Sequence, residues 1–133
     1  MAKTLEQLNL PTNLKYTAEH IWVRAEGDEL VIGISDFAQD QLGEVVYIDL
    51  PSEGDSIAKG AEFGEVESVK SVNTLYMPVA GTIAAVNTAL EDNPTLLNAS
   101  CYEEGWIARI TPEDADAVSA LLSADAYKAG LND

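Results

Sequence analysis

The sequence predicts a mainly β fold, a sandwich or flattened barrel of antiparallel strands decorated by small helices. Two observations lead to this prediction. Short apolar or alternating runs follow one another closely, separated by glycine and proline, as is typical of strands joined by tight turns. The pattern contains no long helical crossover between strands, which argues against a parallel nucleotide-binding sheet.

Seven strands are expected, and several are bounded by recognisable turn residues. The turn at residues 26–29 joins the first two strands into a hairpin, Pro51 stops the third strand, and Pro78 ends the fifth. The expected strands span residues 21–24, 30–34, 45–50, 63–67, 73–77, 82–86 and 106–110.

Helix signals lie between these strands. Ser35 and Asp36 provide N-cap side chains for a short helix, which is expected to end at Gly43. The pair Asn93-Pro94 predicts the start of a single helical turn that follows it. Both helices are too short to form a layer of their own, so they are expected at the periphery.

The C-terminal part of the chain is expected to be helical. Thr111 and Pro112 are typical of a capped helix start, and the acids that follow them lie where the helix dipole favours negative charge. This helix is expected to reach Leu122, and a last helical turn to end at Gly130. The length indicates one domain. Its expected bounds are residues 1–133, with a loosely held leader at 1–14 and a C-terminal helical segment at 112–130.

Composition excludes several function classes. The chain has 133 residues, an apolar share of 47% and a formal net charge of −16, so it is expected to fold but to repel phosphate backbones and anionic membrane surfaces. The first residues have no apolar segment of a secretory signal, and the single cysteine, Cys101, permits no internal disulfide. These features favour the bacterial cytoplasm over a processed mitochondrial form.

An independent active site is not supported by the residue types present. The chain has one histidine, His20, and one cysteine, which together cannot complete a tetrahedral zinc site. A hydrolase triad would need His20 as its base. The acidic pairs lack the spacing of a calcium-binding loop, and no glycine-rich phosphate loop occurs. The protein is therefore expected to be a non-catalytic carrier, with His20 either a structural residue or a polar group in a cleft.

Lys70 is the most informative residue of the chain. It is the only basic residue between Lys59 and Arg109, and it lies at the predicted tip of a hairpin. Alternation predicts that the side chains of Glu65 and Glu67 point outward from the stem. A lysine on such a rigid projection is accessible to a modifying enzyme, so we expect Lys70 to be the covalent attachment point of a prosthetic arm.

The quoted residues resemble the H protein family of the glycine cleavage system, whose members are lipoyl carriers. The strongest likeness is the lipoylation signature around Lys70, which includes Glu67, Ser68, Val69 and Ser71. The similarity extends in order along most of the chain. Its other stretches are residues 16–20, 33–39, 42–46, 75–81, 86–87, 97–98 and 105–106.

This resemblance implies both a fold and a role. The fold is a barrel-sandwich hybrid, like other lipoyl- and biotinyl-carrier domains, with two antiparallel sheets, short peripheral helices and a C-terminal helix. The cofactor is lipoate, attached as lipoyl-lysine at Lys70 by a lipoyl ligase or transferase. The implied partners are a pyridoxal-phosphate glycine decarboxylase that loads an aminomethyl group, a tetrahydrofolate-dependent aminomethyltransferase that removes it, and a flavin dihydrolipoamide dehydrogenase that reoxidises the arm with NAD.

Two residues depart from the family's pattern. Ile21 follows His20 where the family usually has glutamate, and Thr74 stands four residues after the lysine where the family commonly has aspartate. The resemblance implies that His20, Ile21 and Thr74 belong to the cleft that holds the loaded arm. Missing carboxylates are expected to weaken the hold on the cationic aminomethyl group, unless Glu19 replaces them, and Ile21→Glu is expected to slow hydrolysis of the adduct.

Other interpretations of Lys70 lead to different functions. A lipoyl domain of a 2-oxo acid dehydrogenase usually has aspartate before and alanine after the lysine, and a biotin carrier has methionine on both sides, whereas this chain has Val69 and Ser71. An H-like protein that relays lipoyl groups in lipoate assembly is an alternative that fits the altered cleft residues. A plain interaction module without an attached group is a third.

Overall fold

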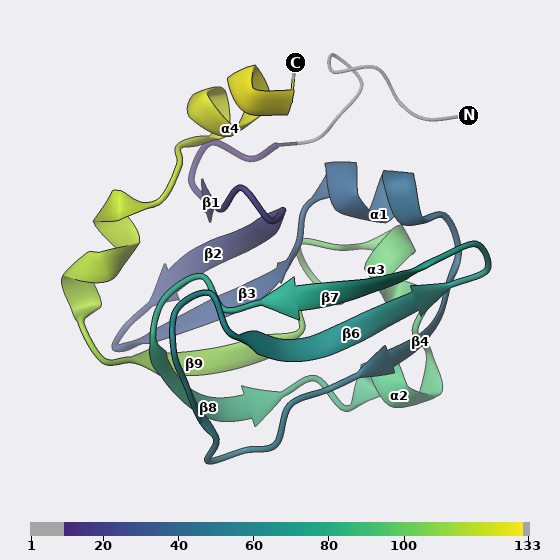
Figure 1. Cartoon of the computed structure of the whole chain (residues 1–133), viewed down its shortest axis with the longest axis horizontal. Coiled ribbons are helices and arrows are strands. Elements are labelled where there is room, and N and C mark those ends of the chain that lie inside the picture. The colour runs from purple at the N-terminus through teal and green to yellow at the C-terminus, as the bar shows by residue number, and fades with distance from the viewer. Residues whose placement is uncertain (1–9, 132–133) are drawn as a thin grey trace.

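The computed structural model describes residues 10–131, and it shows two antiparallel sheets surrounded by short helices (Figure 1). The smaller sheet has the order β4-β6-β7 and the larger one the order β1-β2-β3-β9-β8-β5. This arrangement confirms the predicted mainly β fold with two antiparallel sheets. The strands are β1 (Lys15–Tyr16), β2 (Ile21–Glu26), β3 (Glu29–Ile34), β4 (Val45–Asp49), β5 (Ser56–Ile57), β6 (Glu62–Ser68), β7 (Val72–Tyr76), β8 (Gly81–Val86) and β9 (Ala108–Pro112).

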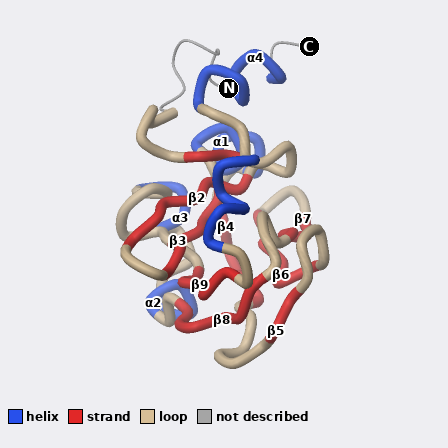
Figure 2. The backbone as a smooth tube through the Cα atoms, turned by 90° about the vertical axis from the view of Figure 1, so that its left-hand side faces the viewer, coloured by secondary structure: helices blue, strands red, loops and turns tan. Residues whose placement is uncertain are grey.

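Short helices lie around the sheets. Figures 1 and 2 show α1 and α4 toward one end of the molecule and α2 toward the other. Among the described residues, none of the helices combines the length and the apolar character needed to cross a membrane. The helices are α1 (Asp36–Leu42), α2 (Ala89–Asp92), α3 (Leu96–Ala99), the 3-10 helix η2 (Ala115–Ala120) and α4 (Ala124–Leu131).

The larger sheet is covered on both faces in its β2–β3 part. Ile21 and Val23 belong to the main core between the sheets, whereas Trp22, between them in sequence, belongs to a second apolar cluster with Tyr16 and Tyr127. Alternation along a strand sends neighbouring side chains to opposite faces, so the second cluster must lie on the far face. This cluster attaches α4 to the sheet.

The last part of the expected leader, residues 10–14, lies in the described part of the chain. Residues 1–9 lie outside the described part of the chain, but Leu14 is buried in the second cluster and β1 follows it directly. The hydroxyl of Tyr16 also donates a hydrogen bond to the carbonyl of Pro11 at 2.8 Å. Leu14 is therefore packed against the domain and Pro11 is hydrogen-bonded to it, whereas Thr12 and Asn13 are exposed. The expected loose leader is corrected at Leu14 and Pro11.

The expected helix from residue 112 to Leu122 is wrong. Strand β9 continues to Pro112, because Thr111 and Pro112 extend its pairing with β8 opposite Thr82 and Gly81. Proline is tolerated there, since the pairing of β9 with β3 already ends at Ile110 and no backbone donor is needed on that side. The chain then forms η2 rather than an α-helix, and the C-terminal helix begins only at Ala124.

Candidate functional site: the Lys70 hairpin and the neighbouring cleft

The stem of the hairpin is formed by β6 and β7 in regular antiparallel pairing over its outer half. Glu67 lies opposite Val72, and Glu65 lies opposite Thr74. Along β6 the side chains of Glu65 and Glu67 are exposed, whereas Val66 and Ser68, between and after them, are buried. The predicted alternation is confirmed, and the stem is anchored in the core by its inward side chains.

The turn at the end of the stem is organised by Ser68. Its backbone N–H donates to the carbonyl of Ser71 at 2.8 Å. Its buried hydroxyl oxygen accepts hydrogen bonds from the backbone N–H groups of Lys70 at 3.3 Å and Ser71 at 3.1 Å. The serine hydroxyl thus occupies two backbone donors of the turn, and Lys70 itself is exposed.

The hairpin tip rests on the loop between α1 and β4. The backbone N–H of Val69 donates to the carbonyl of Glu44 at 3.1 Å. The methylene stem of Lys70 passes over Gly43, where its Cε lies 3.4 Å from the position that a Cβ would occupy. Gly43 also ends α1 with a φ of 77°, a conformation that favours glycine. This one glycine therefore both stops the helix and leaves room for the lysine.

Asn98, on α3, secures the loop under the lysine. Its Oδ1 accepts a hydrogen bond from the backbone N–H of Val45 at 2.9 Å, and its Nδ2 donates to the carbonyl of Gly43 at 2.7 Å. A weaker contact of 3.2 Å joins Nδ2 to Oε1 of Gln39 in α1. One side chain thus connects α3, the end of α1 and the start of β4, the segment against which the hairpin tip rests.

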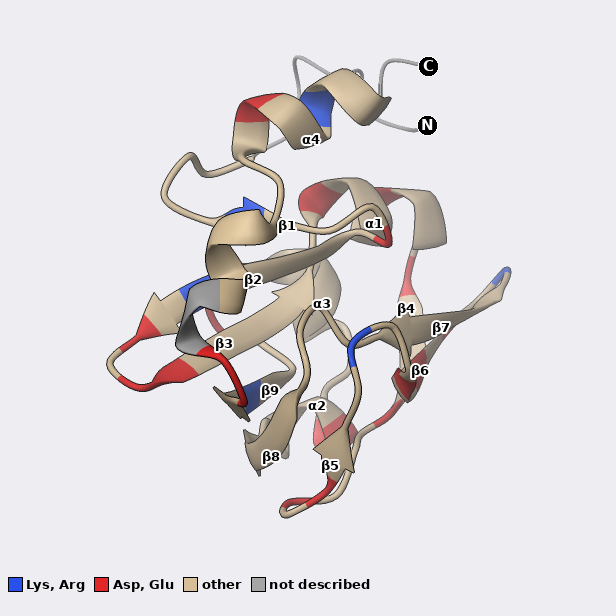
Figure 3. Cartoon of the chain, turned by 60° about the vertical axis from the view of Figure 1, so that its left-hand side comes forward, with Lys and Arg blue, Asp and Glu red and all other residues tan. Residues whose placement is uncertain are grey.

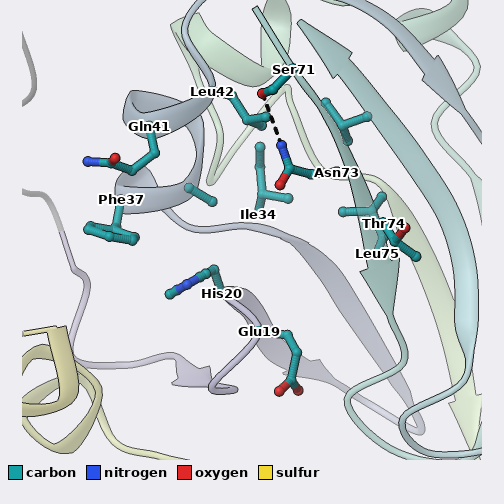
Figure 4. Close-up of a pocket in the computed structure, with 12 residues that line it drawn as sticks. Glu19, His20, Ile34, Phe37, Gln41, Leu42, Ser71, Asn73, Thr74 and Leu75 are labelled. Carbon is teal, nitrogen blue, oxygen red and sulfur yellow. Dashed lines mark hydrogen bonds between the residues drawn. The ribbon is translucent and has the colours of Figure 1, made fainter.

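A cleft of about 360 Å³ opens between α1, the loop before β2, and the hairpin. Figure 4 shows Glu19 and His20 on one side, Phe37 and Gln41 on α1, and Ser71 and Asn73 toward the hairpin end. The residues that line the cleft are Glu19, His20, Ile34, Phe37, Ala38, Gln41, Leu42, Val66, Ser71, Asn73, Thr74 and Leu75.

The structure brings together only some of the residues that the sequence grouped. His20, Thr74 and Ser71 line the cleft, and Glu19 lies beside His20. Ile21 does not line it, because this side chain is fully buried in the main core between the sheets. The placement expected for Ile21 is therefore corrected. The end of the hairpin, rather than the wall of the cleft, is formed by Glu67, Ser68, Val69 and Lys70.

The sequence reasoning missed the residues that α1 adds to the cleft. Phe37, Ala38 and Gln41 lie in or beside the same face of this short helix, at the spacings of three and four residues that place side chains together. The sequence predicted this helix, but helical spacing does not reveal whether a face of the helix meets solvent, core or a cleft.

His20 has an unusual backbone and electrostatic setting. Its φ of 71° makes it the only non-glycine residue with positive φ among residues 10–131, a conformation that is rare for residues with a Cβ. Burial lowers the pKa of its imidazole below the ordinary value, while the nearby charge of Glu19 acts in the opposite direction. Its ring centroid lies 4.9 Å from that of Phe37.

Charge around the attachment candidate is mainly negative. Figure 3 shows a basic residue at the tip of the β6–β7 hairpin, and acidic residues nearer the body of the protein. Glu44, Glu65 and Glu67 are exposed near this hairpin, as is Lys70 itself. Val69 and Val72 are also exposed on either side of the lysine. The tip therefore presents one amine among carboxylates and small apolar side chains.

Comparison with known proteins agrees with the resemblance drawn from the hairpin. The family model described as "Glycine cleavage H-protein" matches residues 14–133. A glycine cleavage system H protein from Bacteroides thetaiotaomicron is 49% identical over 125 residues, covering 94% of this chain and 99% of that protein. The H protein of Listeria innocua is 50% identical over 125 residues and is covered completely, together with 94% of this chain.

A solved structure supports the same assignment. The crystal structure of a glycine cleavage system H protein from Mycobacterium marinum matches with a TM-score of 0.82 and 38% identity, covering 92% of this chain and 98% of that one. The chain therefore shares its two-sheet architecture with the Mycobacterium marinum protein, including the barrel-sandwich arrangement that the resemblance implied. Sequence and structure lead to one conclusion: the chain belongs to the glycine cleavage H-protein family.

Proposed function

We propose that this protein is a lipoyl carrier of the glycine cleavage system and that its attachment point is Lys70. One observation supports this most directly. The chain belongs to this family, and its Lys70 lies on the outside of a hairpin turn whose backbone donors are occupied by Ser68. An open cleft lies beside this turn. A ligase can reach such an amine without unfolding the substrate, and forms an amide between it and the carboxyl group of lipoate.

The bound group would supply the redox and carrier chemistry of a dithiolane, while the protein supplies placement. The hairpin stem fixes the origin of the arm, because Val66 and Ser68 anchor β6 in the core. The arm then samples a limited volume, which raises its effective concentration at each enzyme that docks. No step in this role requires a catalytic group of the protein, so we propose a non-catalytic carrier subunit.

The cleft is proposed to hold the arm after it has been loaded with an aminomethyl group. That group is cationic, and a carboxylate in the cleft would attract it. Thr74 lines the cleft but has no charge, whereas Glu19 lines it and has a carboxylate. We therefore propose that Glu19 partly takes the role that an aspartate at position 74 would have.

The proposed partners are the other components of glycine cleavage. They are a pyridoxal-phosphate glycine decarboxylase, a tetrahydrofolate-dependent aminomethyltransferase and dihydrolipoamide dehydrogenase, with a lipoyl ligase or transferase for the modification. The net charge of −16 favours partners with basic surfaces. We propose the bacterial cytoplasm as the location, since the relatives named above are bacterial and Cys101 is not in a disulfide.

The modification is tested by intact mass analysis after incubation with a lipoyl ligase, lipoate and ATP. We expect the mass to increase by one lipoyl group in the wild-type protein and in the control Lys59→Arg, and to stay unchanged in Lys70→Arg. An unmodified wild-type protein, or a modified Lys70→Arg variant, would contradict the assignment and favour a plain interaction module.

The role in glycine cleavage needs a second assay. Lipoylated protein mixed with glycine decarboxylase is expected to support exchange of bicarbonate into the carboxyl group of glycine. Full lipoylation without any exchange would reject the shuttle and favour the alternative, a relay of lipoyl groups in lipoate assembly. The substitution of the family's aspartate by Thr74 is the observation that keeps this alternative under test.

A further inference from the structure

The C-terminal helix reaches the cleft through one hydroxyl group. Tyr127, on α4, is buried, and its oxygen lies 2.6 Å from Nδ1 of His20 and 2.7 Å from Oγ of Ser35. Ser35 is the N-cap of α1 and accepts a hydrogen bond from the backbone N–H of Ala38 at 3.2 Å. A continuous chain of hydrogen bonds therefore runs from the first turn of α1 to the histidine of the cleft.

The buried serine determines the direction of this chain. Ser35 is fully buried, and its hydroxyl hydrogen needs an acceptor, because a buried donor without one costs about 1–3 kcal/mol. Among residues 10–131, Oγ of Ser35 contacts only the N–H of Ala38 and the hydroxyl of Tyr127. Since an N–H cannot accept, the hydrogen of Ser35 must go to the oxygen of Tyr127.

The hydrogen of Tyr127 then has one acceptor left, Nδ1 of His20. Burial raises the pKa of Tyr127 to about 12, so the hydroxyl keeps its hydrogen at neutral pH. An imidazole whose Nδ1 accepts a hydrogen bond must be neutral and must have its hydrogen on Nε2. The reverse direction would leave the buried hydroxyl hydrogen of Ser35 without an acceptor.

We propose that Tyr127 is a positioning residue that holds His20 as the neutral Nε2–H tautomer, so that the histidine of the cleft is a hydrogen-bond donor rather than a base. His20 is held by two contacts of its side chain and one of its backbone. Tyr127 contacts its Nδ1, the ring of Phe37 packs against it at 4.9 Å, and its backbone carbonyl accepts from the N–H of Ser35 at 2.9 Å.

If the proposed function holds, a neutral His20 affects how the cleft binds the loaded arm. A protonated imidazole in the cleft would repel the cationic aminomethyl group and would pair with the carboxylate of Glu19. The titratable groups near the ring are Glu19, on the same loop, and Tyr127, on the helix packed against it. Because Tyr127 needs Nδ1 as its acceptor, the ring stays neutral and Glu19 remains available to the arm.

The tautomer can be measured without any variant, since His20 is the only histidine of the chain. In protein labelled with ¹⁵N, the two ring nitrogens give one pair of signals at neutral pH. We expect a protonated Nε2 and an unprotonated, hydrogen-bonded Nδ1. A protonated Nδ1 in the neutral ring would overturn the proposal, because the chain would then run in the opposite direction.

The role of Tyr127 is tested with Tyr127→Phe, which keeps the buried ring and removes only the hydroxyl. We expect the Nδ1 signal to shift and the pKa of His20 to rise, because the neutral ring loses a hydrogen bond that favours it. The control is Tyr16→Phe, since the ring of Tyr16 stacks on Tyr127 but its hydroxyl contacts Pro11. Equal shifts in both variants, or none in Tyr127→Phe, would overturn the proposal. Both measurements use unmodified protein, so their outcome is independent of lipoylation.

Discussion

Asn98 is expected to stabilise both the fold and the support of the lysine. In Asn98→Ala, the N–H of Val45 and the carbonyl of Gly43 lose partners at 2.9 and 2.7 Å, and the amide of Gln39 loses a weaker one. A buried backbone group left unpaired costs about 1–3 kcal/mol. Val45 is fully buried, but Gly43 and Asn98 are only partly so and can admit water. We therefore expect the free energy of unfolding to fall by about 2–4 kcal/mol.

This loss is large compared with the total stability of a domain, which is about 5–15 kcal/mol. Urea unfolding, followed by the fluorescence of the two tryptophans, measures it directly. The matched control is Asn93→Ala, because Asn93 is exposed and, among residues 10–131, its Oδ1 accepts only from the exposed hydroxyl of Thr95. The control is expected to change stability by less than about 0.5 kcal/mol.

Asn98→Ala is also expected to slow lipoylation while the protein is still folded. The loop that Asn98 secures accepts the N–H of Val69 and passes under the methylene stem of Lys70. A looser loop would let the turn fray and present the amine in more orientations to the ligase. If Asn98→Ala matched Asn93→Ala in both stability and lipoylation rate, Asn98 would not support the hairpin in the way proposed.

Two further predictions concern the cleft and the core beside it. Thr74→Asp should lengthen the lifetime of the aminomethyl adduct and Glu19→Gln should shorten it, because each changes the number of carboxylates that face the cationic group. A release assay measures this lifetime, with Thr74→Asn as the uncharged control. An unchanged lifetime in both Thr74→Asp and Glu19→Gln would show that the arm does not reach these residues. The family pattern suggests Ile21→Glu as a way to restore a carboxylate. This substitution is instead expected to lower the free energy of unfolding by roughly 3 kcal/mol or more, since Ile21 is fully buried in the main core. A urea midpoint equal to that of Ile21→Val would contradict the observed placement of Ile21.

Features that depend on local signals could be predicted from the sequence. The cap at Ser35, the helix end at Gly43 and the hairpin around Lys70 are predicted and found, because capping side chains, left-handed glycines and alternation act within a few residues. The expectation that Glu65 and Glu67 point outward is confirmed for the same reason. The family likewise follows from ordered motifs along the chain, as the comparisons confirm.

Long-range packing determines which faces of the strands are covered and which distant residues come into contact. Alternation separates Ile21 from Trp22, but it does not reveal that α4 and the residues around Tyr102 bury the second face of β2 as well. Thr111 and Pro112 have the local signals of a helix start, yet pairing with β8 keeps them in a strand. The contact of Tyr127 with His20 joins residues 107 positions apart. Such outcomes depend on long-range packing, and local patterns of sequence contain no information about which distant segment will supply it.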